Sequence, residues 1–181
     1  MLEAAGVEHQ VAAAAIDEAA VKQGLGEAEP AAVALELARA KAAAVSAQRP
    51  GDWVIGSDSV VSVGGRMFDK PVGRPAAAAH LRLFSGQTMQ LTSAVALARN
   101  GAIEWSHHDT AKLHVRELSD GFIDAYLARE WPAVSYCVGV FRIEGPGVQL
   151  FSSIAGDYFT VLGMPLLPLL GALRERGTLA S

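Results

Sequence analysis

Apolar residues recur along the chain with two different periods, and the period changes from segment to segment. Over 31–47 they recur every three or four residues, which predicts a helix, and Pro30 suits its first turn. Lys41 lies beside the face that this helix would bury, which carries Val33, Leu37, Ala40 and Ala44. Further helices are expected over 75–84, 119–130 and 165–176.

Runs of β-branched and other apolar residues, separated by turn signals, predict strands elsewhere. These strands are expected over 53–63, 66–70, 88–99, 102–115, 136–143 and 148–154. Asn100-Gly101 joins two of them and is typical of a tight hairpin, and residues 24–29 are expected to be a loop. Helices and strands do not alternate regularly, so the order predicts a mixed α/β domain with antiparallel hairpins rather than a parallel βαβ sheet.

One carboxylate interrupts the first predicted strand. Asp58 lies among β-branched residues, where an unpaired charge is costly to bury. Lys70, at the end of the expected partner strand, is a candidate counter-ion. A lysine beside a carboxylate suggests an anionic substrate, and the structural alternative is that Asp58 caps a turn.

The composition is that of a globular protein and narrows the classes of partner. The 181 residues are 51% hydrophobic and 19% charged, carry a net charge of −4, and suit one domain. Mild acidity disfavours a general nucleic-acid surface, which needs clustered lysine and arginine, but permits a small charged ligand. The sequence has no secretory signal pattern and no apolar stretch of about 18 residues, so we expect no membrane association and a cytoplasmic location.

Cysteine and histidine do not indicate a site. Cys137, the single cysteine, lies in an apolar stretch and is expected to be a buried strand residue rather than a nucleophile. Full activity of a Cys137→Ser variant would exclude a thiol enzyme. His107 and His108 are adjacent, so on a strand they point to opposite faces, and we expect a solvated strand there.

Several charged residues are not explained by the interpretations above. They are Glu18, Lys41, Asp58, Lys70, Glu144 and Asp157. The sequence lacks the glycine-rich phosphate loops of P-loop and Rossmann proteins. Two lysines and several carboxylates nevertheless fit a site where a hard divalent cation and ammonium groups hold a polyphosphate. For Lys41, Glu18 and Glu144 the alternative is an ordinary solvated surface position.

The order and spacing of these residues resemble the Maf family of nucleoside triphosphate pyrophosphatases. The resemblance spans nearly the whole chain and is carried by Leu37–Ala42, Gly56–Val61, Asp69–Pro71, Leu83–Gly86, Glu144–Gly145 and Gly156–Leu166. It implies an elongated, twisted, mixed β-sheet flanked by helices, similar in fold to inosine triphosphate pyrophosphatases. It also implies cleavage of a nucleoside triphosphate into the monophosphate and pyrophosphate, and a link to arrest of cell division.

The resemblance assigns roles to the candidate residues. Asp58 matches the family's proposed proton acceptor, which deprotonates a water molecule or holds a metal ion. Lys41 and Lys70 match lysines that neutralise phosphate oxygens. Glu18 matches an acid near a divalent cation, Mg²⁺ or Mn²⁺. Ser59 falls at a substrate-binding position, which is usually threonine in the branch that hydrolyses UTP and dTTP.

Glu144 bears on the choice of nucleotide. The UTP and dTTP branch usually has glutamine at this position, whereas a glutamate resembles the branch that hydrolyses 7-methyl-GTP. A carboxylate accepts two hydrogen bonds from the N1–H and N2–H₂ edge of guanine, whereas uracil offers one donor at N3. The sequence therefore favours 7-methyl-GTP or another modified nucleotide as the substrate.

The N-terminal end departs from the family pattern. Family members begin with a strand and a Ser-x-Ser-x-Arg-Arg loop, which binds phosphate at a helix N-terminus. Met1–Gly6 matches only the last turn of that helix, so we expect a single Maf-like domain over 1–181 without that strand and loop. The alternative function is a nucleotide-binding regulator of cell division or an inactive remnant. Apolar residues in 136–141 and 165–173 are expected to form the core and a homodimer contact.

Overall fold

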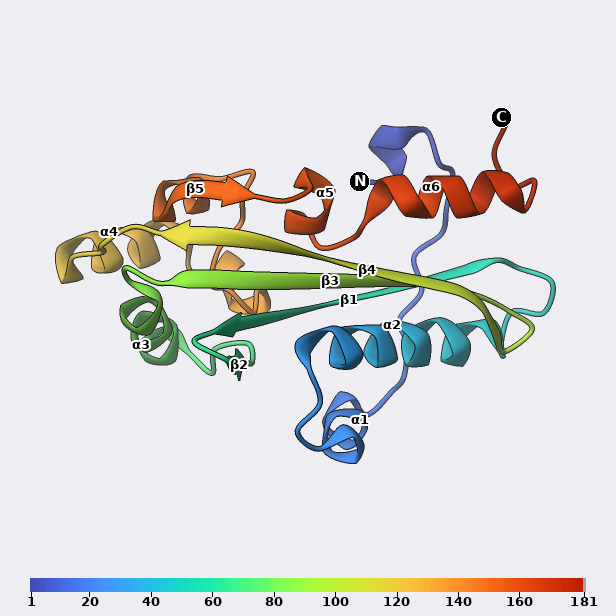
Figure 1. The fold of residues 1–181 in the computed structure, drawn as a ribbon, viewed down its shortest axis with the longest axis horizontal. Helices are drawn as coiled ribbons and strands as arrows, with labels where there is room; N and C mark the ends of the chain where they lie inside the picture. Colours follow the sequence, from blue (N-terminus) through green and yellow to red (C-terminus); the bar gives the residue numbers. More distant parts are fainter. Residues whose placement is uncertain (181) are drawn as a thin grey trace. The chain divides into compact units, whose positions relative to one another are not determined.

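The computed structural model describes residues 1–180, which form an α/β fold around a five-stranded sheet with the order β2-β1-β3-β4-β5 (Figure 1). The strands are β1 Val54–Val63, β2 Arg66–Phe68, β3 Thr88–Arg99, β4 Ala102–Val115 and β5 Phe151–Ala155. The α-helices are α1 Glu18–Leu25, α2 Pro30–Ser46, α3 Arg74–Phe84, α4 Asp120–Glu130, α5 Tyr158–Val161 and α6 Leu166–Glu175. The 3₁₀ helices are η1 Glu3–Ala5, η2 Ala133–Tyr136 and η3 Pro146–Leu150.

The chain divides into two compact units. The first unit comprises Met1–Asp58, Ser93–Asp109 and Gly163–Ser181, and the second comprises Ser59–Thr92 and Thr110–Leu162. The division falls within β1, β3 and β4, so each of these strands contributes residues to both units. The expectation that 1–181 is a single domain stays a prediction.

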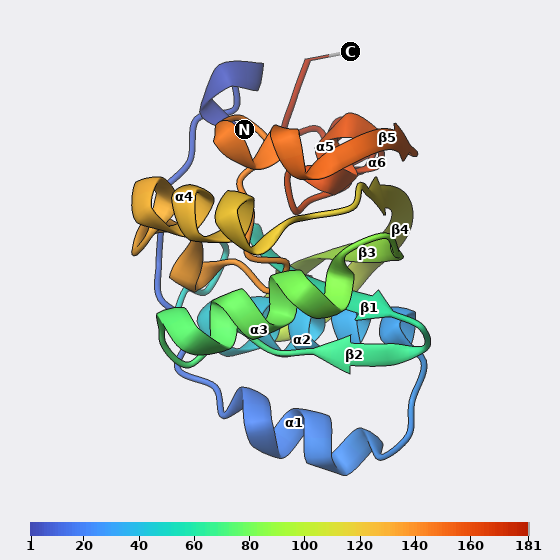
Figure 2. The same ribbon diagram turned by 90° about the vertical axis from the view of Figure 1, so that its left-hand side faces the viewer.

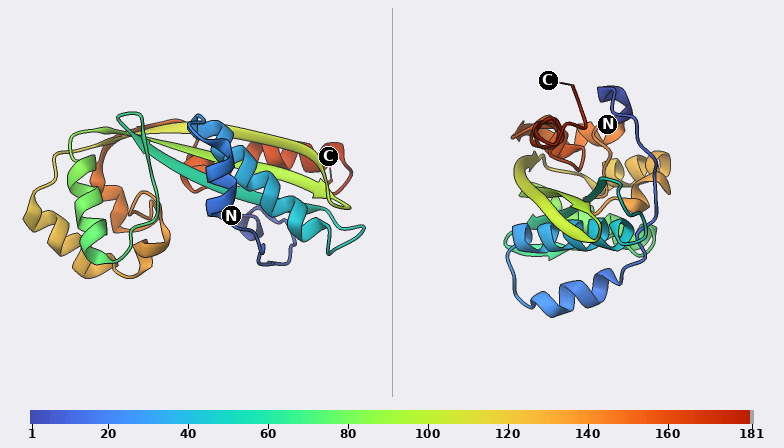
Figure 3. Two further views of the ribbon diagram at one scale, coloured as in Figure 1. Left: turned by 90° about the horizontal axis from the view of Figure 1, so that it is seen from below. Right: turned by 90° about the vertical axis from the view of Figure 1, so that its right-hand side faces the viewer.

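In the first unit, the strand segments lie between α2 and α6 (Figures 1 and 3). Helix α1 packs against α2 and buries none of its own residues. Gly56 brings β1 close to α2, because a side chain at that position would collide with the Ala38 carbonyl oxygen and the Ala42 backbone nitrogen. The buried residues of α2 are Val33, Ala34, Leu37, Ala38, Ala42 and Ser46.

In the second unit, α3 and α4 pack against each other (Figure 2). Strand β2 pairs antiparallel with the end of β1, placing Val61 opposite Phe68. Strand β5 pairs antiparallel with the end of β4, placing Leu113 opposite Ile154. The core of this unit includes Val61, Phe68, Leu81, Phe84, Met89, Leu113, Ile123, Leu127, Val140 and Leu150.

Most of the predicted elements are confirmed. The strands over 88–99 and 102–115 have the predicted bounds, and the helix predicted over 119–130 begins after Ser119, whose hydroxyl caps it. Helix α2 also forms, but its buried face is shifted. Ala40 and Ala44 are only half-buried, whereas Ala38 and Ala42 are fully buried, because these alanines face the bare Gly56 backbone.

The strand predicted over 136–143 is wrong, because this segment forms turns after η2. Val140 and Phe141 are buried as their apolar character suggested, but Val140 has φ 57°, which no extended strand allows. An apolar run cannot by itself distinguish a buried loop from a buried strand. The run over 148–154 begins as η3 and becomes a strand only at Phe151.

Two α-helices within residues 1–180 were not predicted. Helix α1 extends through Gly24, a residue that had indicated a loop, and its eight residues provide no buried apolar face to detect. Helix α5 is a single turn. Among the described residues, no helix has both the length and the apolar character needed to cross a membrane.

Candidate active site

Three charged residues of the first unit come from three different elements. Glu18 opens α1, because the Asp17 side chain caps that helix by accepting a hydrogen bond from the Ala20 backbone nitrogen at 3.0 Å. Lys41 lies in α2, and Asp58 lies in β1 two residues after Gly56. Side chains alternate along a strand, so residues 56 and 58 share the face of β1 that approaches α2.

The Lys41 ammonium joins the two carboxylates. Its Nζ donates to Asp58 Oδ1 at 2.5 Å and contacts Glu18 Oε1 at 2.7 Å. The side chains of Lys41 and Asp58 are 22% and 14% exposed, and that of Glu18 is 42% exposed. The ionic partner of Asp58 is therefore Lys41, and not Lys70 as the hairpin pattern had suggested. We refer to Glu18, Lys41 and Asp58 as the acidic-lysine cluster.

Burial and hydrogen bonding set the protonation of this cluster. Burial raises the pKa of Asp58 above the ordinary 3.8, against the opposing hydrogen bond from Lys41, and the Glu18 charge raises that pKa further. Burial disfavours the charged form of Lys41, but hydrogen bonds to Asp58 and Glu18 outweigh it and raise the Lys41 pKa above 10.5. Lys41 is therefore cationic at neutral pH, and Asp58 is a stronger base than an exposed aspartate.

The cluster has donors suited to a divalent cation. Glu18 and Asp58 both contact the same ammonium nitrogen, so their carboxylates lie close together. Mg²⁺ is commonly bound by one or two carboxylates together with phosphate oxygens of the substrate, and this donor set fits that requirement. Within residues 1–180, no group of three or more histidine, cysteine, aspartate or glutamate side chains is placed to hold a metal ion.

Lys22 is a further cation that the sequence reasoning did not identify. It lies one helical turn after Glu18 on α1 and is half-buried. Its charge favours the ionised form of Asp58. The i,i+4 spacing of glutamate and lysine was the available signal, but it is equally typical of a solvated helix.

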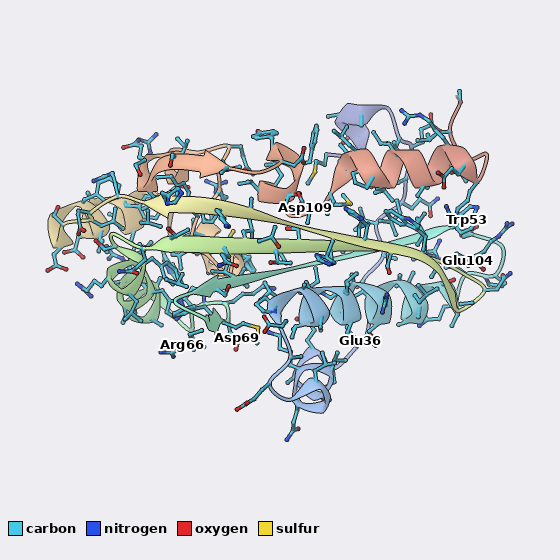
Figure 4. All side chains as sticks on the ribbon, viewed as in Figure 1. Glu36, Trp53, Arg66, Asp69, Glu104 and Asp109 are labelled. Carbon is cyan, nitrogen blue, oxygen red and sulfur yellow. The ribbon has the colours of Figure 1, made fainter. Side chains whose placement is uncertain are left out.

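The other predicted site residues belong to the second unit. Ser59 follows Asp58 in β1 and is half-buried, and Lys70 follows β2 and is exposed. Arg66 and Asp69, which Figure 4 labels, come from the same arm of the hairpin as Lys70. Glu144 is exposed in the segment between η2 and η3. The roles assigned to Ser59, Lys70 and Glu144 stay predictions.

Cys137 is half-buried in the turn after η2, so the prediction that it is a buried strand residue is wrong. Burial and the Glu144 charge raise the pKa of the Cys137 thiol, while Arg142 and Lys70 oppose that rise. A raised pKa lowers the thiolate fraction at neutral pH, which disfavours a role for Cys137 as a nucleophile. The same influences place Glu144, Arg142 and Lys70 within electrostatic range of one thiol.

Two polar residues have structural roles that the sequence left open. Asp157, which the charge pattern had singled out, caps α5 by accepting hydrogen bonds from the Phe159 and Thr160 backbone nitrogens at 2.9 and 3.1 Å. Glu130, the last residue of α4, is paired with Arg142. Sequence reasoning missed this ion pair, because the end of a helix usually exposes its charged residues.

The chain is similar to known proteins over nearly its full length. A family model described as Maf-like protein matches residues 1–176. The 7-methyl-GTP pyrophosphatase of Rhizobium meliloti is 48% identical over 181 residues, which are 99% of this chain and 91% of that protein. The 7-methyl-GTP pyrophosphatase of Brucella suis is 49% identical over 177 residues, which are 97% of this chain and 89% of that protein. The nucleoside triphosphate pyrophosphatase of Paramagnetospirillum magneticum is 46% identical over 181 residues, 99% of this chain and 93% of that protein.

Proposed function

Because the chain belongs to the Maf-like protein family, we propose that it hydrolyses a nucleoside triphosphate to the nucleoside monophosphate and pyrophosphate. The acidic-lysine cluster carries this proposal. In this cluster a partly buried ammonium contacts two carboxylates. A carboxylate can accept a proton, and the ammonium supplies positive charge to phosphate oxygens.

Asp58 acts as the general base in this proposal. A water molecule attacks the α-phosphorus and gives its proton to the Asp58 carboxylate. The bond from that phosphorus to the oxygen bridging to the β-phosphate breaks, and its electron pair leaves with pyrophosphate. The raised pKa of Asp58 suits this role, because it brings the basicity of the carboxylate closer to neutral pH.

Lys41 and Lys70 neutralise phosphate oxygens. Lys41 is charged at neutral pH, since its hydrogen bonds to two carboxylates raise its pKa. Negative charge moves toward the leaving pyrophosphate during the reaction, so a fixed cation stabilises the transition state more than the ground state. Glu18 and Asp58 would hold Mg²⁺ or Mn²⁺, which supplies further positive charge to the phosphates when bound.

Glu144 recognises the base, and 7-methyl-GTP is the proposed substrate. Glu144 is exposed, and its carboxylate can accept two hydrogen bonds from the N1–H and N2–H₂ edge of guanine. The positive charge that methylation places on the guanine ring adds to the attraction of a carboxylate. The names of the Rhizobium meliloti and Brucella suis relatives support this choice.

Pyrophosphate release by the purified protein with Mg²⁺ or Mn²⁺ tests the proposal. Asp58→Asn should lower kcat by about 10²–10⁴-fold, the usual contribution of a general base. Asp124→Asn, an exposed aspartate in α4, is the matched control and should keep wild-type activity. Faster turnover of UTP or dTTP than of 7-methyl-GTP would refute the choice of substrate.

The same assay separates the proposed enzyme from a nucleotide-binding regulator. Binding of 7-methyl-GTP by the wild-type protein without any pyrophosphate release would favour the regulator or an inactive remnant. Cytoplasmic location, a role in cell division and a homodimer contact stay predictions. Two exposed apolar side chains, Tyr136 and Leu167, lie in the segments suggested for that contact and are 78% and 58% exposed.

A further inference from the structure

Glu144 lies in the segment 137–145, between η2 and η3, which forms turns rather than a strand. Its backbone turns repeatedly, with hydrogen bonds from Val140 N to Cys137 O at 3.0 Å and from Gly145 N to Arg142 O at 3.2 Å. A base-reading side chain on irregular backbone needs support from a neighbouring rigid element. In the second unit that element is α4.

Helix α4 holds the segment first through Tyr126. The Tyr126 hydroxyl donates to the Val140 carbonyl oxygen at 2.9 Å, and both residues are buried. Val140 has φ 57°, a left-handed conformation that a β-branched residue rarely adopts. The backbone is therefore fixed in an unfavourable conformation by a buried hydrogen bond from the helix.

A second contact between α4 and this segment is made by Glu130. The Glu130 carboxylate is 5% exposed, and its Oε2 accepts hydrogen bonds from Arg142 Nη2 at 2.8 Å and Nε at 3.3 Å. A buried carboxylate is costly, and the last residue of a helix is the least favourable place for one, because the helix dipole is negative there. Core stability alone does not account for a glutamate at this position.

The Arg142 backbone is also fixed by close packing against Gly147 in η3. A side chain at Gly147 would collide with the backbone nitrogen and carbonyl oxygen of Arg142, so η3 packs directly against it. Arg142 therefore has a side chain bound to α4 and a backbone packed against η3. Glu144 comes two residues later, within the turn that the Arg142 carbonyl closes.

We infer that the Glu130–Arg142 ion pair positions Glu144 and thereby sets the selectivity for the nucleotide base. This inference rests on the proposed function and extends it to residues that need not touch the substrate. Glu130 is then a positioning residue, whose loss changes the choice between 7-methyl-GTP and UTP more than it changes turnover in general.

The test compares kcat/KM for 7-methyl-GTP and UTP in single and double variants. Glu130→Gln keeps the shape but removes the charge, and should lower the preference for 7-methyl-GTP about tenfold, the size of one weakened charge-assisted contact. Arg129→Gln changes the neighbouring exposed residue and should leave the preference unchanged. In a Glu144→Gln background, Glu130→Gln should add no further change, because the side chain that it positions is already altered.

Arg142→Lys is a second variant in case Glu130→Gln does not fold, as judged by its melting temperature. It keeps the charge opposite Glu130 but not the two-pronged geometry, so its preference should fall between wild type and Glu130→Gln. An equal loss of activity toward both nucleotides, or additive effects of Glu130→Gln and Glu144→Gln, would overturn the inference. If wild type releases pyrophosphate and Glu144→Gln alone shifts the preference, only the inference fails. If wild type releases none, the proposed function fails with it.

Discussion

Gly56 controls the distance between the helix that carries Lys41 and the strand that carries Asp58, so a single methyl group there should disturb the acidic-lysine cluster. In Gly56→Ala, the added Cβ would collide with the Ala38 carbonyl oxygen and the Ala42 backbone nitrogen, and would lie 2.9 Å from the Ala42 side chain. Backbone atoms cannot rotate away from such a contact. The helix must therefore shift away from β1.

Overpacking of this kind costs about 1–3 kcal/mol, and contact with backbone atoms places this variant at the upper end. For a chain of this size, a loss of about 3 kcal/mol lowers the melting temperature by about 6–12 °C. The shift also moves Lys41 Nζ away from Asp58 Oδ1, which now lie 2.5 Å apart. A displacement of about 1 Å in a catalytic group can lower kcat/KM by about 10²-fold.

Thermal unfolding and pyrophosphate release measure the two effects. Gly171→Ala in α6 is the matched control, because the backbone there is helical and, apart from its chain neighbours and the nearby backbone of α6 itself, no atom lies within 4 Å of the added methyl group. That variant should gain about 0.5–1 kcal/mol through the better helix propensity of alanine, with unchanged activity. Equal melting temperatures for Gly56→Ala and wild type would refute the reasoning, because α2 would then shift away from β1 without any loss of unfolding free energy.

Two further predictions concern polar groups that the fold encloses. Lys41→Met should destabilise the protein by about 1–3 kcal/mol at pH 7, because it leaves the partly buried Asp58 without its cation. The fold raises the Lys41 pKa above 10.5, so the stabilisation is complete below pH 10.5 and is lost as the pH rises through the folded pKa. In urea unfolding, the difference in unfolding free energy between wild type and Lys41→Met should therefore become smaller at higher pH. A difference that does not change with pH would contradict the ion pairing. Tyr126→Phe should cost about 1–3 kcal/mol in urea unfolding by leaving the buried Val140 carbonyl without its donor, and an unchanged midpoint would show that this hydrogen bond is not needed.

Local signals were enough for the elements whose residues interact mainly with their own neighbours. Asn100-Gly101 indicated the hairpin between β3 and β4, and Ser119 indicated the start of α4, because turn and cap preferences act over a few residues. The same reasoning failed over 136–143. Burial of Val140 and Phe141 depends on contacts with α4 and the rest of the core, and these contacts can hold a turn as well as a strand.

The sequence by itself determined the family, the sheet hairpins and the types of charged residue available for phosphate chemistry, because these are properties of residue order and spacing. Only the tertiary structure decided that Lys41 pairs with both Asp58 and Glu18, which lie 17 positions after it and 23 positions before it in the chain. It also revealed that the buried Glu130 carboxylate pairs with Arg142, two residues before Glu144. Ion pairs between elements depend on how closely backbones approach, as at Gly56, and no local pattern specifies that distance.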